Sequence, residues 1–168
     1  MTTALIIGGG MNVSPYNRED YDLLCVVNLG IQEFTHVDIW VSGLVDIEQQ
    51  RALMKGREVG MLLRVHTEDL HWINKYPIEL HSKVVVMDSD RYKALKNFYR
   101  PKKPTTGVAG IWYLMEKCDT VYYTGFDGYE TPNRFNLIEG HTAENHNFSK
   151  DKIMLDVWSK NANLVKLT

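Results

Sequence analysis

Short, continuous apolar runs alternate with longer amphipathic segments along this chain, and this alternation limits the fold more than any other feature. A run that is apolar at nearly every position is typical of a strand buried on both faces, as in parallel sheets covered by helices. Strands and helices that alternate in this way form α/β folds. The runs predicted as strands are Ala4–Ile7, Asp22–Val27, Val37–Val41, Gly60–Val65, Lys83–Met87, Thr120–Thr124 and Leu164–Leu167.

The segments between these runs are predicted as helices, and polar caps mark the start of two: Asp88–Asp90 precedes one, and Ser149 precedes the last. The predicted helices are Asp46–Lys55, Glu68–Lys75, Arg91–Tyr99, Val108–Lys117 and Lys150–Lys160. We therefore predict a Rossmann-like α/β fold, a mostly parallel sheet with helices on both faces, in a single domain over residues 1–168. Ligands of such sheets bind beyond the carboxyl ends of the strands, so the informative loops are 8–16, 28–35, 101–106 and 127–147.

The overall charge argues against broad, non-specific binding to nucleic acid. The chain has 19 Lys and Arg against 21 Asp and Glu, a net charge of −2. A local basic strip nevertheless precedes the turn at Pro104. It is either a solvated helix face or a strip that faces phosphate. Its members are Lys93, Lys96, Arg100, Lys102 and Lys103.

The two cysteines, Cys25 and Cys118, make no disulfide framework, and each lies in or beside an apolar run. We expect both to be small buried residues in a reducing compartment. No apolar run approaches the roughly 20 residues that span a bilayer, and Met1–Ile7 resembles a first strand more than a signal peptide. The sequence therefore predicts a cytoplasmic protein.

A tight glycine turn, Gly8-Gly9-Gly10-Met11-Asn12, follows the first predicted strand. Such a turn lets a ligand approach the backbone closely. It is not the dinucleotide-binding motif, whose third glycine and later acidic residue are absent, and it lacks the Lys-Ser/Thr ending of a P-loop. By itself, the turn only suggests a phosphate or nucleotide nearby.

A second turn, Pro104-Thr105-Thr106-Gly107, opens a predicted helix that leads into the strand Thr120–Thr124 and then Gly125-Phe126-Asp127. The first N–H groups of a helix have no partner within it, so they can bind an anion. A nucleotide phosphate or a carboxylate would suit this place. An ordinary helix cap would give the same sequence pattern.

Three further polar residues are candidates for a site. Asn28 ends a predicted strand, where its amide could contact a nucleobase, a ribose or a phosphate, or simply form a turn. His141 and His146 lie in a polar stretch, where they could exchange protons with a hydroxyl and a leaving phosphate, or be ordinary surface residues. Their spacing does not match a metal-binding motif, so we predict no metal site.

Taken together, these segments resemble the sialyltransferases. Pro104–Gly107, the following helix and Cys118-Asp119-Thr120-Val121 through Phe126 are similar to the small sialyl motif of that family. The first strand, the glycine turn, Asn28 and Val37-Asp38 are similar to the large motif. Gly140-His141-Thr142 resembles the third motif. His146 and Asp151 resemble the very small motif, with Asp in place of Glu. The four motifs appear in the family's order and span nearly the whole chain.

The resemblance implies a GT-A-like variant of the Rossmann-like fold and an inverting, metal-independent glycosyltransferase. The donor would be a nucleotide-sugar, in the family a CMP-linked sialic acid, and no other cofactor is implied. His146 would be the general base, His141 would stabilise the departing phosphate, and Asp151 would orient the element that carries His146. The donor would contact Gly9, Gly10, Asn12, Asn28, Thr105, Thr106 and Gly107.

The chain also departs from the family pattern. Cys118 matches one of the family's paired cysteines, but Cys25 lies elsewhere, so the resemblance implies a disulfide-free relative of bacterial or phage type. The large motif is degenerate at Gly10-Met11-Asn12, which leaves the donor sugar open. The acceptor could be a glycan, a small molecule or a hydroxymethylated DNA base. In the last case the basic strip would hold the DNA backbone.

Two other functions fit the same residues. The chain could be a non-catalytic nucleotide-binding module, which would keep both turns but needs no histidines. It could also be a nucleoside deoxyribosyltransferase, which needs a carboxylate nucleophile beside the sugar. Asp127 and Glu130 are the candidates for that nucleophile. The oligomeric state stays open.

Overall fold

The strands form one seven-stranded sheet in a computed structural model, which describes residues 1–44, 46–65, 70–76, 78–87, 89–127 and 146–168. Every described strand pair is parallel, in the order β5-β4-β3-β2-β1-β6-β7. The predicted parallel sheet is therefore confirmed. The strands are β1 Thr3–Ile7, β2 Leu23–Val27, β3 His36–Ser42, β4 Glu58–Arg64, β5 Val84–Val86, β6 Thr120–Thr124 and β7 Leu164–Lys166.

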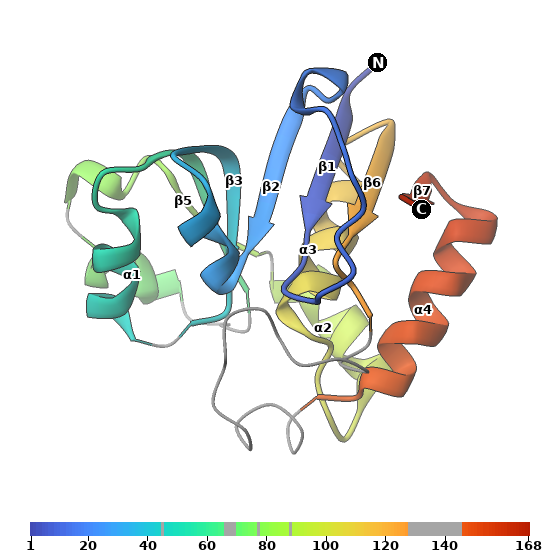
Figure 1. Ribbon diagram of the computed structural model, residues 1–168. Coiled ribbons are helices and arrows are strands. Elements are labelled where there is room, and N and C mark those ends of the chain that lie inside the picture. The colour runs from blue at the N-terminus through green and yellow to red at the C-terminus, as the bar shows by residue number, and fades with distance from the viewer. Residues whose placement is uncertain (45, 66–69, 77, 88, 128–145) are drawn as a thin grey trace.

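The strand order reverses between β1 and β6. The chain builds the sheet outward from β1 to β5 and then returns to place β6 on the other side of β1. The connections that follow these two strands leave in opposite directions, which opens a crevice at their carboxyl ends. In Figure 1 the two strands lie side by side, with β7 beyond β6 at the edge of the sheet.

Helices cover both faces of the sheet, as predicted. In β1, Ala4 and Ile6 belong to one apolar cluster while Leu5 and Ile7 belong to the other, because successive side chains of a strand point to opposite faces. The first cluster contains residues of α2, α3 and α4. The second contains Ile31 and Tyr76, with residues of α1 packed against it. The α-helices are α1 Ile47–Met54, α2 Ser89–Tyr99, α3 Thr106–Met115 and α4 Phe148–Asn161.

Several predicted boundaries are wrong. Ser149 does not cap the last helix: α4 begins at Phe148, and Asn147 Oδ1 accepts a hydrogen bond from the backbone N–H of Lys150 at 3.0 Å. Asn and Ser are both good caps, so sequence alone cannot choose between neighbouring positions. Residues 28–35 were expected to be a loop, yet Asn28–Glu33 forms a 3₁₀ helix. The other 3₁₀ helices are Arg18–Asp20, Leu70–Lys75 and Ile78–Leu80.

Smaller expectations about the core are confirmed. Cys25 and Cys118 are buried and free, and burial raises the pKa of both thiols. Tyr122 and Tyr123 pack into opposite clusters, because successive side chains of a strand point to opposite faces of the sheet. In the basic strip the side chains other than that of half-buried Lys96 are exposed. Among the described residues no helix is both long and apolar enough to cross a membrane.

Candidate functional site

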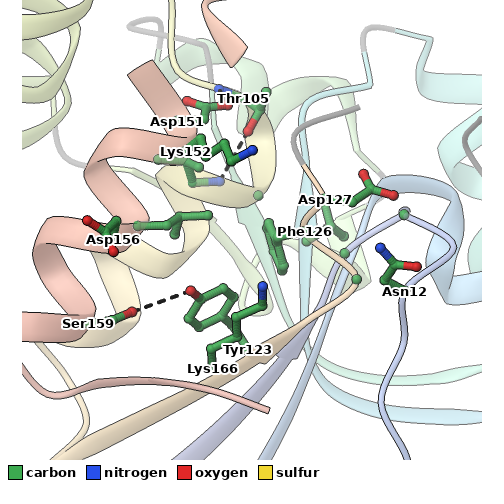
Figure 2. Close-up of a pocket in the computed structure, with 18 residues that line it drawn as sticks. Asn12, Thr105, Tyr123, Phe126, Asp127, Asp151, Lys152, Asp156, Ser159 and Lys166 are labelled. Atoms are coloured by element: carbon green, nitrogen blue, oxygen red, sulfur yellow. Dashed lines mark hydrogen bonds between the residues drawn. The ribbon is translucent and has the colours of Figure 1, made fainter. Parts of the chain in front are cut away.

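A cavity of about 410 Å³ lies between α4 and the carboxyl ends of β1 and β6 (Figure 2). It therefore occupies the crevice that the strand order creates. Its walls come from segments far apart in the sequence: the glycine turn after β1, the start of α3, the loop after β6, one face of α4 and the end of β7. The predicted site residues that line it are Gly9, Gly10, Asn12, Thr105, Gly107 and Asp151.

Backbone hydrogen bonds join the loops that follow β1 and β6. The N–H of Gly8 donates to the carbonyl of Thr124 at 2.9 Å, and that of Gly10 to the carbonyl of Gly125 at 2.8 Å. Gly125 has φ of +72°, a conformation that favours glycine. A β-carbon on Gly8 would lie 2.4 Å from the Gly125 carbonyl oxygen. Both Gly8 and Gly125 must therefore be glycine for the two loops to come so close. This contact between the loops shapes one end of the cavity.

The start of α3 forms another part of the cavity wall. Thr105 caps the helix, since its Oγ1 accepts from the N–H of Val108 at 3.4 Å. Within the described part of the chain, the backbone N–H groups of Thr106 and Gly107 have no acceptor. Gly107 lines the cavity. The partial positive charge of a helix N-terminus therefore lies at the cavity wall, where it favours an anion.

One peptide unit, Pro104–Thr105, is held at both ends by the segment around α4. Its carbonyl, on Pro104, bonds Nδ1 of His146 at 2.9 Å, and its N–H, on Thr105, donates to Asp151 Oδ2 at 3.3 Å. Asp151 is in the first turn of α4, and His146 is just before that helix. This arrangement brings two predicted catalytic residues to the predicted anion-binding turn.

The hydrogen bond to Pro104 also fixes the tautomer of His146. A carbonyl oxygen can only accept, so Nδ1 must carry the hydrogen, and in the neutral ring Nε2 then carries the lone pair. Burial lowers the pKa of His146, and the backbone hydrogen bonds oppose this only in part. The ring stacks on Phe148 with centroids 6.3 Å apart. His146 is thus neutral near pH 7, the state that a general base requires.

Asp151 is an unusual carboxylate. Its side chain is only 4% exposed, and burial raises its pKa to about 6, although the hydrogen bond from Thr105 and the nearby Tyr99 hydroxyl oppose this shift. Tyr99, on α2, is fully buried, and burial together with the nearby carboxylate raises the pKa of its hydroxyl strongly. A perturbed carboxyl group at a cavity wall is a common feature of functional sites.

Three of the predicted site residues have a different environment. Asn28 is absent from the described cavity wall. Its φ is +47°, and its Oδ1 accepts from the N–H of Gly43 at 2.9 Å, so its visible role is to shape the turn after β2. Thr106 and His146 are likewise outside the described lining. His141 and Glu130 are outside the described residues. The roles assigned to all these residues stay predictions.

Sequence reasoning missed the polar wall that α4 and β7 contribute. Lys152, Asp156 and Ser159 lie on one face of α4, and Lys166 lies at the end of β7 (Figure 2). Ser159 Oγ and the Tyr123 hydroxyl are 3.3 Å apart. The positions of Lys152, Asp156 and Ser159 are four and three residues apart, which places them on one helix face. This spacing of polar residues is the signal in the sequence that could have identified the α4 part of the wall.

Asp127, the proposed nucleophile of the deoxyribosyltransferase alternative, also lines the cavity, and its carboxylate packs against Gly10. Among the described residues, no three His, Cys, Asp or Glu side chains are grouped so that they could hold a metal ion. Because residues 128–145 are outside the described residues, the predicted lack of a metal site stays a prediction.

Comparison with known proteins supports the fold. No family model matches the sequence, and no curated protein matches it significantly. Solved structures do match over 99% of this chain. The sialyltransferase CstII from Campylobacter jejuni with the substrate analogue cytidine-5′-monophosphate is 15% identical, with a TM-score of 0.61 over 80% of its chain. An apo alpha-2,3-sialyltransferase from the same organism is 17% identical, with a TM-score of 0.60 over 75% of its chain.

A third match is the sialyltransferase CST-II in complex with a trisaccharide acceptor and CMP, which is 15% identical with a TM-score of 0.64 over 81% of its chain. At these identities the likeness establishes the fold. The fold predicted from the motif resemblance, a Rossmann-like sheet as in sialyltransferases, is confirmed.

Proposed function

We propose that this protein is a glycosyltransferase that moves a sugar from a CMP-linked donor to a hydroxyl group of an acceptor. The observation that carries this proposal is that both turns, through Gly8–Gly10 and through Thr105 and Gly107, line one cavity where the strand order reverses. The cavity combines unpaired helix amides, suited to a phosphate, with a glycine-rich wall that a ligand can approach closely. Structures of the same fold contain CMP.

The leaving group of the proposed reaction is one that protein groups can stabilise without a metal ion. CMP carries a single phosphate, whose charge grows as the bond to the sugar breaks. Fixed N–H donors aimed at that charge lower the barrier. The N–H groups of Thr106 and Gly107 are the donors that this chain offers from α3, and His141 is the further donor that the motif resemblance implies. We therefore propose a metal-independent reaction.

His146 is the proposed general base. The acceptor oxygen attacks the anomeric carbon, the bond from that carbon to the phosphate oxygen breaks, and the hydroxyl proton passes to Nε2 of His146. A single displacement of this kind inverts the anomeric configuration. The neutral Nδ1–H tautomer, fixed by the Pro104 carbonyl, supports this role. A neutral hydroxyl is the nucleophile, so a base of near-neutral pKa is what the step needs.

The proposed acceptor is a glycan hydroxyl, because a structure of the same fold contains a trisaccharide acceptor. The distinguishing feature of the deoxyribosyltransferase alternative is a covalent sugar on Asp127. Mass spectrometry of the protein after incubation with donor tests this directly. An adduct that Asp127→Asn removes would replace our proposal with the alternative.

Binding is the first test of the proposal. We expect CMP to raise the melting temperature more than UDP or GDP, since a ligand that binds the folded state stabilises it. Transfer from CMP-linked sialic acid to a panel of oligosaccharides is then followed by release of CMP. Stabilisation by UDP alone would redirect the donor assignment, and CMP binding without any transfer would favour the non-catalytic module.

The base is tested with His146→Ala, which we expect to abolish transfer and to leave CMP binding within about twofold. His81→Ala is the matched control. His81 is also half-buried and bonds a backbone carbonyl, that of Tyr76, at 2.9 Å, but it lies just before the edge strand β5 and not at the Pro104–Thr105 peptide that His146 bonds. We expect this control to retain full transfer. Full activity in His146→Ala would remove the proposed base.

A further inference from the structure

Behind the start of α3, a buried carboxyl group faces a buried phenol. Asp151 Oδ2 accepts from the N–H of Thr105, while Asp151 Oδ1 and the Tyr99 hydroxyl are both buried without a hydrogen bond of ordinary geometry. The two groups are nonetheless close enough to perturb each other's ionisation. Asp151 also lines the cavity beside Gly107. An incompletely paired carboxyl group therefore sits directly beside the proposed anion site.

Few positive charges offset this carboxylate. Tyr99 faces it from α2 and Thr105 from the cap of α3. His146 bonds the same peptide unit, and its own pKa is lowered further by Lys102 and Lys103. The other charged groups of the cavity wall are Lys152 and Asp156 on α4, Asp127 after β6 and Lys166 on β7. Among the described residues, no lysine or arginine forms an ion pair with Asp151.

We propose that Asp151 takes up a proton when the phosphate of the donor binds at the start of α3. The inference rests on the proposed function. A bound phosphate brings a second negative charge beside a carboxylate that is already poorly solvated, and like charges in such a place favour the neutral acid. The proton comes from solvent and binds Oδ1, whose O–H can then donate to the Tyr99 oxygen. Oδ2 keeps the hydrogen bond from Thr105.

The sign of the pH dependence follows from this scheme. In the free protein the pKa of Asp151 is about 6, so the group is mostly ionised at pH 7. Bound phosphate raises that pKa further, so binding is strongest below pH 6 and weakens as the pH rises through the raised value. By linkage, a rise of about one pKa unit makes binding about tenfold weaker at high pH than at low pH.

The probe should carry a charge that does not itself change. CMP alone is unsuitable as the probe. The second ionisation of its phosphate monoester lies near pH 6, so its own charge would change over the pH range of the experiment. Cytidine 5′-(methyl phosphate), a diester like the donor, keeps one negative charge over the whole range. Calorimetry at pH 6.5 in two buffers of different ionisation enthalpy then gives the number of protons taken up. We expect the parent protein to take up a sizeable fraction of one proton.

Variants assign that proton to a residue. In Asp151→Asn we expect most of the uptake to be lost, and in the double variant Asp151→Asn/His146→Ala we expect none and an affinity that does not change between pH 5.5 and 7.5. In His146→Ala we expect the uptake to persist, which separates the two titrating groups. Circular dichroism and thermal unfolding check that each variant is folded. Independently, carbon NMR of the Asp151 carboxyl group in the parent protein should show a higher pKa with the diester bound than without it.

The outcomes separate this inference from the function on which it rests. Uptake that is undiminished in Asp151→Asn, or an Asp151 pKa that is the same with and without ligand, overturns the inference. Binding of the diester without uptake also overturns it and leaves the donor proposal intact. If neither the diester nor a CMP-sugar binds the parent protein, the proposed function fails, and the inference fails with it.

Discussion

Gly107→Ala tests whether the start of α3 and the loop after β6 are packed as closely as the structure indicates. A β-carbon on Gly107 would lie 2.3 Å from Cε1 of Phe126 and 3.0 Å from its Cζ. The Phe126 ring packs edge-on against Tyr123, with centroids 5.9 Å apart, so it cannot move away without disturbing the cavity floor.

Forcing an extra carbon into such a contact costs about 1–3 kcal/mol, and the better helix propensity of alanine returns up to about 1 kcal/mol. We expect a net loss of about 1–2 kcal/mol. For a chain of this size that lowers the melting temperature by about 2–8 °C. Because Phe126 and Gly107 both line the cavity, CMP affinity should fall as well.

The assay is thermal unfolding combined with calorimetric titration of CMP, with Gly56→Ala as the control. Gly56 has φ of +74° and no atom within 4 Å of its added carbon. Its substitution therefore costs only the backbone strain, about 1 kcal/mol, and should leave CMP affinity unchanged.

The double variant Gly107→Ala/Phe126→Leu should recover part of the lost stability. A Gly107→Ala protein as stable as its parent would refute the close packing, and lost affinity in Gly56→Ala would show that affinity does not report on the cavity.

Three further predictions follow from the same structure. Asn28→Ala should lose about 2 kcal/mol in urea unfolding, because it removes the bond to Gly43 and puts alanine at φ of +47°, whereas Asn28→Gly should lose only about 1 kcal/mol; equal losses would contradict the strain argument. Burial raises the pKa of Cys25 and Cys118, so both thiols should react with a disulfide reagent only after unfolding, and rapid reaction of the native protein would contradict their burial. In the pH profile of kcat/KM for the donor, the limb that rises with pH should have a midpoint below 6.5, because burial lowers the pKa of His146 in the free protein and the base acts when neutral; a rising limb that persists unchanged in His146→Ala would exclude this histidine.

The sequence predicts the sheet well because its strands are nearly uniformly apolar. β6 has its predicted bounds, Thr120–Thr124, and each of the other strands differs from its predicted bounds by at most two residues at either end. The first and last residues of the helices are harder to predict. Asn147 and Ser149, for example, are equally plausible caps, and the choice between them depends on tertiary contacts. The Asn28 segment shows the same limit: the Gly43 N–H that its side chain binds comes from a different strand end.

The candidate site is only partly predictable for a related reason. Turns rich in glycine or threonine are visible in the sequence, so Gly9, Gly10, Thr105 and Gly107 could be chosen before the fold was known. The wall formed by α4 and β7 depends on which face of the helix meets the sheet. Residues such as Lys152 and Ser159 become site residues only through that packing.

The Pro104–Thr105 peptide explains why two motifs distant in the sequence belong to one unit. His146 bonds its carbonyl and Asp151 accepts from its N–H. Hydrogen bonds at the two ends of one peptide polarise each other in a weakly solvated environment. An ionised Asp151 therefore makes the Pro104 carbonyl a better acceptor, which strengthens its hold on the Nδ1–H of His146. A proton on Asp151 weakens that hold. The spacing between His146 and Asp151 thus links the orientation of the proposed base to the charge state of the group beside the proposed phosphate site.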